Sequence, residues 1–291
     1  MSEVLRFDVK TISPEQTRKG LTRRIGELGV NQLLLIRNNE DSSEQPPSTA
    51  LLTVRSEYKK GRRNSASGVW FADMAIDGMP ATQAVAIKPK LPPWLVAQEF
   101  RTANEINQSS QQQLTFRPIG FVSIKAKEER HGIITKFEED VTSFDNILHP
   151  DNGEKPDADT VTSALGCAAA ALVILHGLGY EHGDYLLQNT ACDSSGQPRI
   201  IDITSAEKRK RPNDFRTDPE LYIGSLSRFG QIKPLATREQ IIDCFLDPYR
   251  REIPNIFSNP EQRREMLSII DCIAAMIDKR GVLMTSHRGR R

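Results

Sequence analysis

The sequence predicts an α+β protein, with strands mainly in the first half of the chain and helices mainly in the second. Between residues 50 and 137, short runs rich in β-forming residues are separated by polar turns, with one helix among them. From about Asp157 the chain becomes helical, beginning with the alanine-rich apolar segment Val161 to Gly177. Because strands and helices are segregated along the chain, we expect two lobes, a β-rich one at residues 1–136 and a helical one at 137–291.

The composition is typical of a globular protein, and it argues against several functions. Of the 291 residues, 38% are hydrophobic and 26% are charged. The net charge of +1 and the lack of aromatic residues among the basic clusters argue against nucleic-acid binding. The longest fully apolar run, Cys167 to Leu175, is too short to span a bilayer. The cysteines form no C-x-x-C pair, and the chain does not open with a signal pattern, so we expect a cytoplasmic protein with reduced thiols and no membrane contact.

The first half begins with a helical extension and continues as strands. Ser13-Pro14-Glu15 has an N-cap, a first-turn proline and an acid, which predicts a helix that runs to Gly29. A second helix begins at Pro92-Pro93, with apolar positions that recur at helical spacing up to Ile106. The predicted strands are 33–36, 50–58, 68–74, 83–88, 119–124 and 132–137.

The second half is predicted to be helical around one hairpin. Asp193-Ser194-Ser195-Gly196 is a turn sequence between two short apolar runs. Thr237 is a predicted helix N-cap. Asn259-Pro260-Glu261 predicts the start of a last helix that stops at Gly281.

The strongest functional signal is the segment His182-Gly183-Asp184, followed by Asn189 and then by Ile200-Ile201-Asp202. Phosphoryl transfer requires a carboxylate that orients the attacking hydroxyl, oxygen ligands for Mg²⁺ and a cation on the phosphates. Asp184 is the candidate for the first role. Asn189 and Asp202 would lie on adjacent strands of the hairpin, and they carry the hard oxygen ligands that Mg²⁺ prefers.

The candidate cation is Lys88, at the end of the apolar strand Ala84-Val85-Ala86-Ile87-Lys88. A lysine in that position is explained if its ammonium group contacts phosphates. It would need a carboxylate partner, and both Glu99 and Glu105 are candidates on the following helix. The distance along the chain favours Glu105, but the sequence context resembles the kinase helix at Glu99, and we take Glu99 as the partner.

These residues resemble the protein-kinase-like superfamily over roughly residues 50–205. Val85-Ala86-Ile87-Lys88 matches the V-A-I-K motif. His182-Gly183-Asp184 with Asn189 is similar to the catalytic loop of aminoglycoside phosphotransferases and lipopolysaccharide kinases, and Asp202 matches the metal-binding aspartate of D-F-G. The resemblance implies a two-lobed fold that binds ATP and Mg²⁺. It also implies Asp184 and Lys88 as catalytic residues, with the backbone of Phe137 facing adenine.

The chain departs from the kinase pattern in two places. Asp202-Ile203-Thr204 replaces D-F-G, which makes a phenylalanine-flip switch doubtful. No G-x-G-x-x-G precedes Lys88; instead the backbone of Ser65, Ser67 and Gly68 would hold the phosphates. Serine-bearing loops of this kind are similar to those of HipA-like kinases, which leads us to expect autophosphorylation on Ser65 or Ser67. The alternative is that residues 64–67 form an ordinary polar turn.

The predicted function is transfer of the γ-phosphate of Mg-ATP to a hydroxyl, with a protein serine or threonine as the favoured acceptor. A sugar, antibiotic or lipid-sugar acceptor is the alternative within the same chemistry. The alternative outside enzymology is a catalytically silent kinase-fold binding module. The retention of Lys88, Asp184, Asn189 and Asp202 together argues against a silent module. The basic run Lys208 to Arg211 would either hold a phosphorylated or acidic substrate or be disordered.

Overall fold

The protein mixes helices and sheets in two compact units, of which the computed structural model describes residues 5–10, 32–37, 49–54, 69–76, 83–124, 130–148, 156–226 and 235–278. Unit 1 comprises residues 1–104 and 116–138, and unit 2 comprises residues 105–115 and 139–291. The boundary divides one helix, α2 (Pro93–Ser109), after Asn104.

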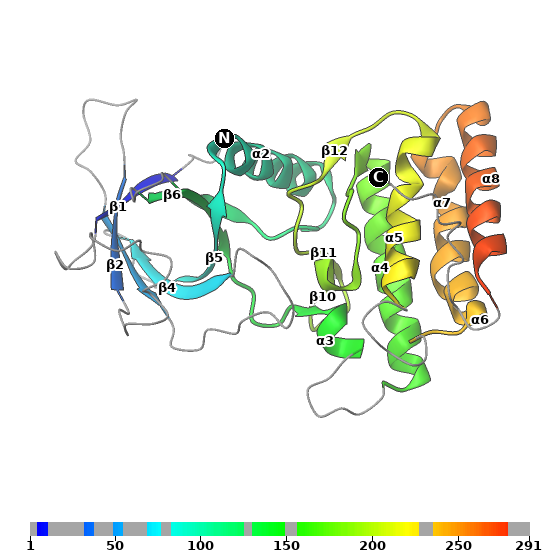
Figure 1. The fold of residues 1–291 in the computed structure, drawn as a ribbon, viewed down its shortest axis with the longest axis horizontal. Helices are drawn as coiled ribbons and strands as arrows, with labels where there is room; N and C mark the ends of the chain where they lie inside the picture. The colour runs from blue at the N-terminus through cyan, green and yellow to red at the C-terminus, as the bar shows by residue number, and fades with distance from the viewer. Residues whose placement is uncertain are drawn as a thin grey trace, which may run out of the picture. The chain divides into compact units, whose positions relative to one another are not determined.

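Unit 1 is built on a closed barrel (Figure 1) in which the strand order is β1-β2-β3-β4-β5-β7-β6. Neighbouring strands pair antiparallel except β1 and β6, which pair parallel and close the barrel. The strand bounds are Leu5–Lys10 (β1), Gln32–Arg37 (β2), Thr49–Val54 (β3), Trp70–Ile76 (β4), Gln83–Leu91 (β5), Pro118–Ile124 (β6) and Arg130–Lys136 (β7).

The predicted strands of unit 1 are all present, but the sequence did not indicate β1 or the closure of the sheet. β1 is short and its partner β6 lies far along the chain, so no local sequence pattern predicts that the two strands pair. The predicted helix 13–29 and the predicted phosphate-binding residues Ser65, Ser67 and Gly68 lie outside the described residues. The predicted strand 50–58 is described up to Val54, as β3.

The two faces of β5 have different neighbours because side chains alternate along a strand. Val85 and Ile87 are buried on one face. Lys88 is on the other face, opposite Ile133 of β7 in the pairing register. Ile133 packs with Val96 and Phe100 of α2, which places α2 over the face that carries Lys88. The pairing of β5 with β7 becomes irregular between Lys88 and Leu91, where Pro89 supplies no backbone N–H.

Unit 2 is organised around α4 (Ala158–Gly177), which begins where Asp157 accepts a hydrogen bond from the N–H of Thr160 at 2.7 Å. The predicted helix at Val161 to Gly177 is therefore confirmed, with one more turn at its start. Its small side chains let neighbouring elements approach closely, and Ala168, Leu172 and Leu175 are fully buried. Among the described residues, α4 is the one helix that is long and apolar enough to cross a membrane. The buried core helices of soluble proteins meet the same criteria of length and composition.

Short elements surround α4 (Figure 1). A sheet of order β11-β10-β8 and a pair β12-β9 lie in unit 2. The predicted hairpin is confirmed as β10 and β11, and the N-caps Thr237 and Asn259 are confirmed, although the last helix ends at Met276 rather than Gly281. The bounds are Thr142–Ser143 (β8), Phe144–Leu148 (α3), Tyr180–Glu181 (β9), Leu187–Asn189 (η2), Thr190–Cys192 (β10), Pro198–Ile200 (β11), Glu207–Lys208 (β12), Pro212–Phe215 (η3), Thr217–Ser225 (α5), Arg238–Ile241 (α6), Ile242–Leu246 (η4), Asp247–Ile256 (α7) and Pro260–Met276 (α8).

Candidate functional site

The loop between β9 and η2 carries the candidate catalytic residue Asp184, and glycine is required just before it. Gly183 has a φ of +76°, a conformation that other residues adopt at a cost. A Cβ at this position would lie 3.1 Å from the backbone oxygen of Ser205. The H-G-D sequence therefore contains its glycine for two steric reasons, the positive φ and the close approach of the segment after Asp202.

A buried carboxylate that the sequence analysis missed holds this loop from behind. Asp218, at the start of α5, has no exposed surface. Its oxygens accept hydrogen bonds from the backbone N–H of His182 at 2.7 Å and of Gly183 at 2.8 Å. It also pairs with Nε2 of His176 at 3.0 Å. Burial alone would raise the pKa of Asp218, but the hydrogen bonds that it accepts from His176 and from the backbone of His182 lower it below its ordinary value.

His182 is fully buried behind the loop. Its Nδ1 accepts a hydrogen bond from the backbone N–H of Asp184 at 3.2 Å. Burial lowers the pKa of His182, against the opposing charges of Asp218, Asp202 and Asp184. The imidazole is therefore kept neutral, and it shapes the loop without acting as a charged group.

Asp184 and Asn189 lie in direct contact. Nδ2 of Asn189 donates to the backbone oxygen of Asp184 at 2.8 Å and to its carboxylate at 2.9 Å. These bonds use the amide nitrogen and leave an amide oxygen as the atom with which Asn189 can bind a metal. Burial raises the pKa of Asp184, while the hydrogen bond from Asn189 lowers it. A partly buried carboxylate with a raised pKa is a common property of groups that handle protons.

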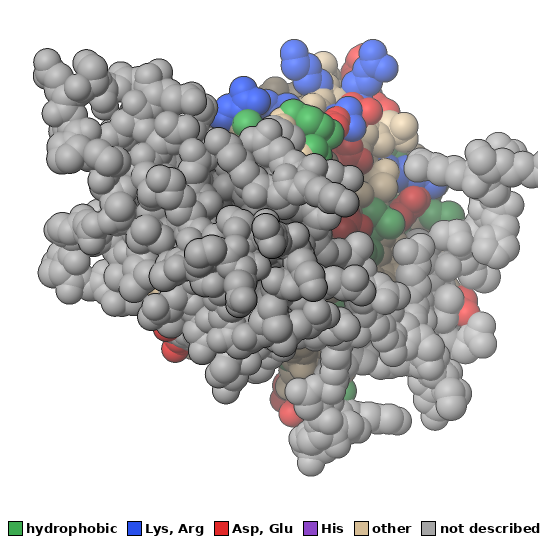
Figure 2. All heavy atoms as spheres, turned by 60° about the vertical axis from the view of Figure 1, so that its left-hand side comes forward, with side chains coloured by type: hydrophobic (Ala, Val, Ile, Leu, Met, Phe, Trp, Pro, Cys, Tyr) green, Lys and Arg blue, Asp and Glu red, His purple; other side chains and the backbone are tan. Residues whose placement is uncertain are grey.

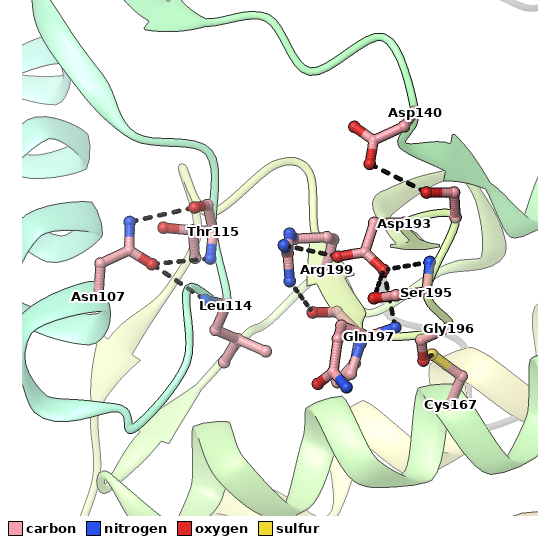
Figure 3. A network of polar contacts seen from close by, with 12 residues as sticks. Asn107, Leu114, Thr115, Asp140, Cys167, Asp193, Ser195, Gly196, Gln197 and Arg199 are labelled. Carbon is pink, nitrogen blue, oxygen red and sulfur yellow. Dashed lines mark hydrogen bonds and ion pairs between the residues drawn. The ribbon is translucent and has the colours of Figure 1, made fainter.

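Asn189 and Asp202 lie just before and just after the hairpin of β10 and β11, rather than on its strands. The hairpin is held by a polar network at its turn (Figure 3). One oxygen of Asp193 accepts from the N–H and hydroxyl of Ser195 and from the N–H of Gln197, and the other accepts from Arg199 at 2.7 Å. The Cys167 thiol donates to the backbone oxygen of Gly196 at 3.5 Å. Burial raises the pKa of this thiol to about 12, so it remains protonated and is part of the packing.

On its other side, β11 is bordered by the segment that follows α2. Leu114 accepts the N–H of Ile200 at 2.8 Å, and Thr115 forms a parallel bridge with the same residue. The Asn107 side chain fixes this segment (Figure 3) by accepting the N–H of Leu114 and of Thr115 and donating to the Thr115 carbonyl. β11 is thus held on both edges before the chain reaches Asp202.

Asp202 follows the hairpin immediately. The backbone N–H of Ile201 donates to the carbonyl of Asn189 at 2.9 Å, which joins the two candidate metal residues through adjacent backbone. The Oδ1 atom of Asp202 accepts from the N–H of Thr204 at 3.0 Å and from its hydroxyl at 2.6 Å. Thr204, at the position where a D-F-G motif has glycine, therefore orients the carboxylate. Among the described residues no cluster of three or more His, Cys, Asp or Glu side chains suits a metal ion.

The structure pairs Lys88 with Glu99 and gives Glu105 a different role. Nζ of Lys88 lies 3.5 Å from Oε2 of Glu99, and both side chains are largely buried. Glu105 instead pairs with Nζ of Lys208 at 2.7 Å and accepts the hydroxyl of Tyr180 at 2.5 Å. Of the two carboxylates considered from the sequence, Glu99 is thus the one in contact with Lys88.

The basic run after Asp202 is only partly available for a ligand. Lys208 pairs with Glu105, and Arg209 pairs with both Glu181 and Glu207. Figure 2 shows basic and acidic side chains next to each other on the described part of one face, rather than a uniformly basic surface.

Two further sets of residues were predicted to bind the nucleotide, Phe137 and the group Ser65, Ser67 and Gly68. The backbone N–H of Phe137 donates to the carbonyl of Ala84 at 2.9 Å, so a contact between this residue and adenine would come through its carbonyl oxygen. Ser65, Ser67 and Gly68 lie outside the described residues, and both their phosphate-binding role and autophosphorylation stay predictions.

The sequence carried little sign of the residues that support the loop. Asp218 reads as an ordinary acid in the first turn of a helix, and His176 as a helix-end residue. His176 and Asp218 are 42 positions apart along the chain, so only the tertiary structure brings them together.

Comparisons with known proteins leave the family open. No protein-family model matches the chain, and no curated protein matches it. Among solved structures, the chain is similar to WaaP in complex with acyl carrier protein, at 14% sequence identity and a TM-score of 0.40. That similarity covers 73% of this chain and 86% of the other.

Proposed function

We propose that this chain is an ATP-dependent phosphotransferase of the protein-kinase-like type, which moves the γ-phosphate of Mg-ATP to a hydroxyl. The observation that carries the proposal is the contact of Asp184 with Asn189 in a loop braced by buried Asp218. A partly buried carboxylate bound to an amide that keeps its oxygen for a metal suits an enzyme of phosphoryl transfer. The buried ion pair of Lys88 with Glu99 supports the same function.

Each residue has a separate role in the proposed reaction. Asp184 accepts a hydrogen bond from the acceptor hydroxyl and directs its oxygen at the γ-phosphorus. Lys88 neutralises charge on the phosphates, and Glu99 fixes the lysine so that little entropy is lost when nucleotide binds. Burial of Glu99 without a cation would be costly, which explains why the pair is kept together.

The proposed cofactor fits the atoms that the chain offers. Asn189 and Asp202 present an amide oxygen and a carboxylate, which are hard ligands suited to Mg²⁺. Mg²⁺ sites of this type complete their coordination with phosphate oxygens and water, so a larger cluster of acids is unnecessary. The metal, when bound with ATP, would neutralise charge on the transferring group.

The segment between Asp202 and α5 bears on which class of hydroxyl compound accepts the phosphate. The sequence favours a protein serine or threonine, but the segment between Asp202 and α5 favours a small hydroxyl compound. In protein kinases a long activation segment follows D-F-G. Here the corresponding backbone pairs with β9 through β12, donates from Arg209 to the Gly179 carbonyl at 2.7 Å, and accepts from Gln262 at Lys210. A segment held in this way has less backbone to offer a bound peptide.

The proposal is tested with the purified full chain and Mg-ATP. Asp184→Asn should abolish phosphate transfer while nucleotide binding survives, and Asp202→Asn should weaken Mg-dependent binding of ATP. Asp159→Asn, at an exposed position in the first turn of α4, serves as the control and should behave like the wild type. Turnover is followed by release of ADP with candidate sugars and with a cell extract as acceptor sources.

Three outcomes separate the alternatives. Protein bands that take up label from the γ-phosphate of ATP with the wild type, but not with Asp184→Asn, would support a protein acceptor. Small molecules that take up this label would support a small hydroxyl compound as the acceptor. Wild-type protein that binds Mg-ATP without any turnover would indicate a silent binding module. Normal turnover by Asp184→Asn would refute the assignment of that residue.

A further inference from the structure

A buried chain of hydrogen bonds connects the catalytic loop with helix α7, which contributes none of the candidate site residues. Tyr249, near the start of α7, lies with its hydroxyl oxygen 2.6 Å from Nδ1 of His176. Nε2 of His176 lies 3.0 Å from Asp218, and Asp218 accepts the N–H groups of His182 and Gly183. The side chains of Tyr249, His176 and Asp218, which form these hydrogen bonds, are all buried.

Ionised Asp218 can only accept, so Nε2 of His176 carries a proton and donates to it. Burial raises the pKa of Tyr249 well above its ordinary value, so the hydroxyl keeps its proton. A protonated hydroxyl can both donate and accept, so the direction of its bond to Nδ1 depends on whether the imidazole is neutral. We take the neutral imidazole, in which the Tyr249 hydroxyl donates to Nδ1. The ring of Phe215 packs against the imidazole of His176, with 4.6 Å between the two ring centroids.

A local irregularity of the helix precedes Tyr249. Residues Ile242–Leu246 form a π-helical turn between α6 and α7, and this turn packs against α4. π-helical turns are rare and are found frequently at functional sites. The turn changes the rotation of the residues that follow it, and Tyr249 is the residue of α7 whose hydroxyl reaches His176.

We infer that Tyr249 is a positioning residue for phosphate transfer, which acts through His176 and Asp218 on the loop that carries Asp184. By fixing Nδ1, Tyr249 selects the ring form of His176 that donates to Asp218. Asp218 in turn keeps the N–H groups of His182 and Gly183 in place, one residue before the candidate base. The catalytic part of this inference rests on the proposed function, whereas the hydrogen-bond chain does not.

The test compares Tyr249→Phe with Tyr222→Phe. The first removes only the hydroxyl bonded to His176. The control removes an equally buried tyrosine hydroxyl in α5, that of Tyr222, which is not part of the hydrogen bonds that join Tyr249 to the loop. Amide hydrogen exchange by NMR, together with the ¹⁵N shifts of His176, is measured on the full-length chain for both variants and for the wild type.

We expect the amides of His182 and Gly183 to exchange about tenfold faster in Tyr249→Phe and to keep wild-type rates in Tyr222→Phe, because local opening follows local contacts. In the wild type, the ¹⁵N shifts should place the proton of His176 on Nε2. Unchanged exchange at both amides, an equal increase in both variants, or a proton on Nδ1, with or without one on Nε2, would overturn the inference.

Kinetics provide a second and separate readout. Tyr249→Phe should lower kcat about tenfold with an unchanged KM for ATP, as expected when a group acts on the transition state without contacting nucleotide. A raised KM with unchanged kcat would contradict the positioning role. If the wild type shows no turnover, the proposed function fails, while hydrogen exchange still decides whether Tyr249 holds the loop.

Discussion

Replacement of Asp218 by asparagine tests how strongly the loop is braced, with almost no change in side-chain shape. The two carboxylate oxygens accept three hydrogen bonds, from the N–H of His182 at 2.7 Å, the N–H of Gly183 at 2.8 Å and Nε2 of His176 at 3.0 Å. Asparagine keeps one acceptor oxygen and presents an NH₂ group in place of the other. Whichever way the amide is turned, at least one buried donor then faces another donor.

The magnitude follows from these contacts. A buried donor left without a partner costs about 1–3 kcal/mol, and the remaining bonds lose the added strength of a charged acceptor. We therefore expect Asp218→Asn to lower the free energy of unfolding by about 3 kcal/mol at neutral pH. Because the folded-state pKa of Asp218 is below 3.8, its contribution is present above that pH and is lost as the pH falls through the folded-state pKa.

Urea unfolding followed by circular dichroism provides the measurement, with Asp159→Asn as an exposed control. The stability difference between wild type and Asp218→Asn should be largest at neutral pH and should shrink below pH 3.8. A loss of less than about 1 kcal/mol at neutral pH, the range of an exposed ion pair, would refute the argument that this carboxylate braces the loop.

Three further predictions follow from the same loop and hairpin. Gly183→Ala should lower the free energy of unfolding by about 1–2 kcal/mol because of its positive φ, whereas Gly177→Ala, with no atom within 4 Å of the added Cβ, should not; thermal unfolding compares them. Asp193→Ala should cost about 1–2 kcal/mol in urea unfolding, since it removes the acceptor for the hairpin turn. The acidic limb of kcat/KM against pH should lie above 3.8, because burial raises the pKa of Asp184 and only its ionised form orients the hydroxyl; a limb below 3.8 would contradict this role.

Local sequence was sufficient for the elements whose signals lie within a few residues. Three side chains accept hydrogen bonds from backbone groups close to them in the chain: the helix caps Thr237 and Asn259, and Asp193 at the hairpin turn. Because the partners are so near, the residue type alone predicts the cap or turn. The apolar run before Lys88 likewise predicted a strand, although β5 continues beyond this lysine to Leu91. Asp184, Asn189 and Asp202 were nominated as a set from their spacing and from the resemblance to the kinase catalytic loop.

The tertiary structure decided what depends on distant partners. Sequence context had favoured Glu99 as the partner of Lys88 and separation along the chain had favoured Glu105, and the structure places Glu99 in contact with Lys88 and Glu105 in contact with Lys208. The closure of the barrel through β1 and β6 was also hidden, because each strand satisfies the other's backbone only after the chain has folded back. The bracing of the loop by Asp218 has the same origin: a buried charge is recognisable by its partners, and those partners come from α4 and the loop itself.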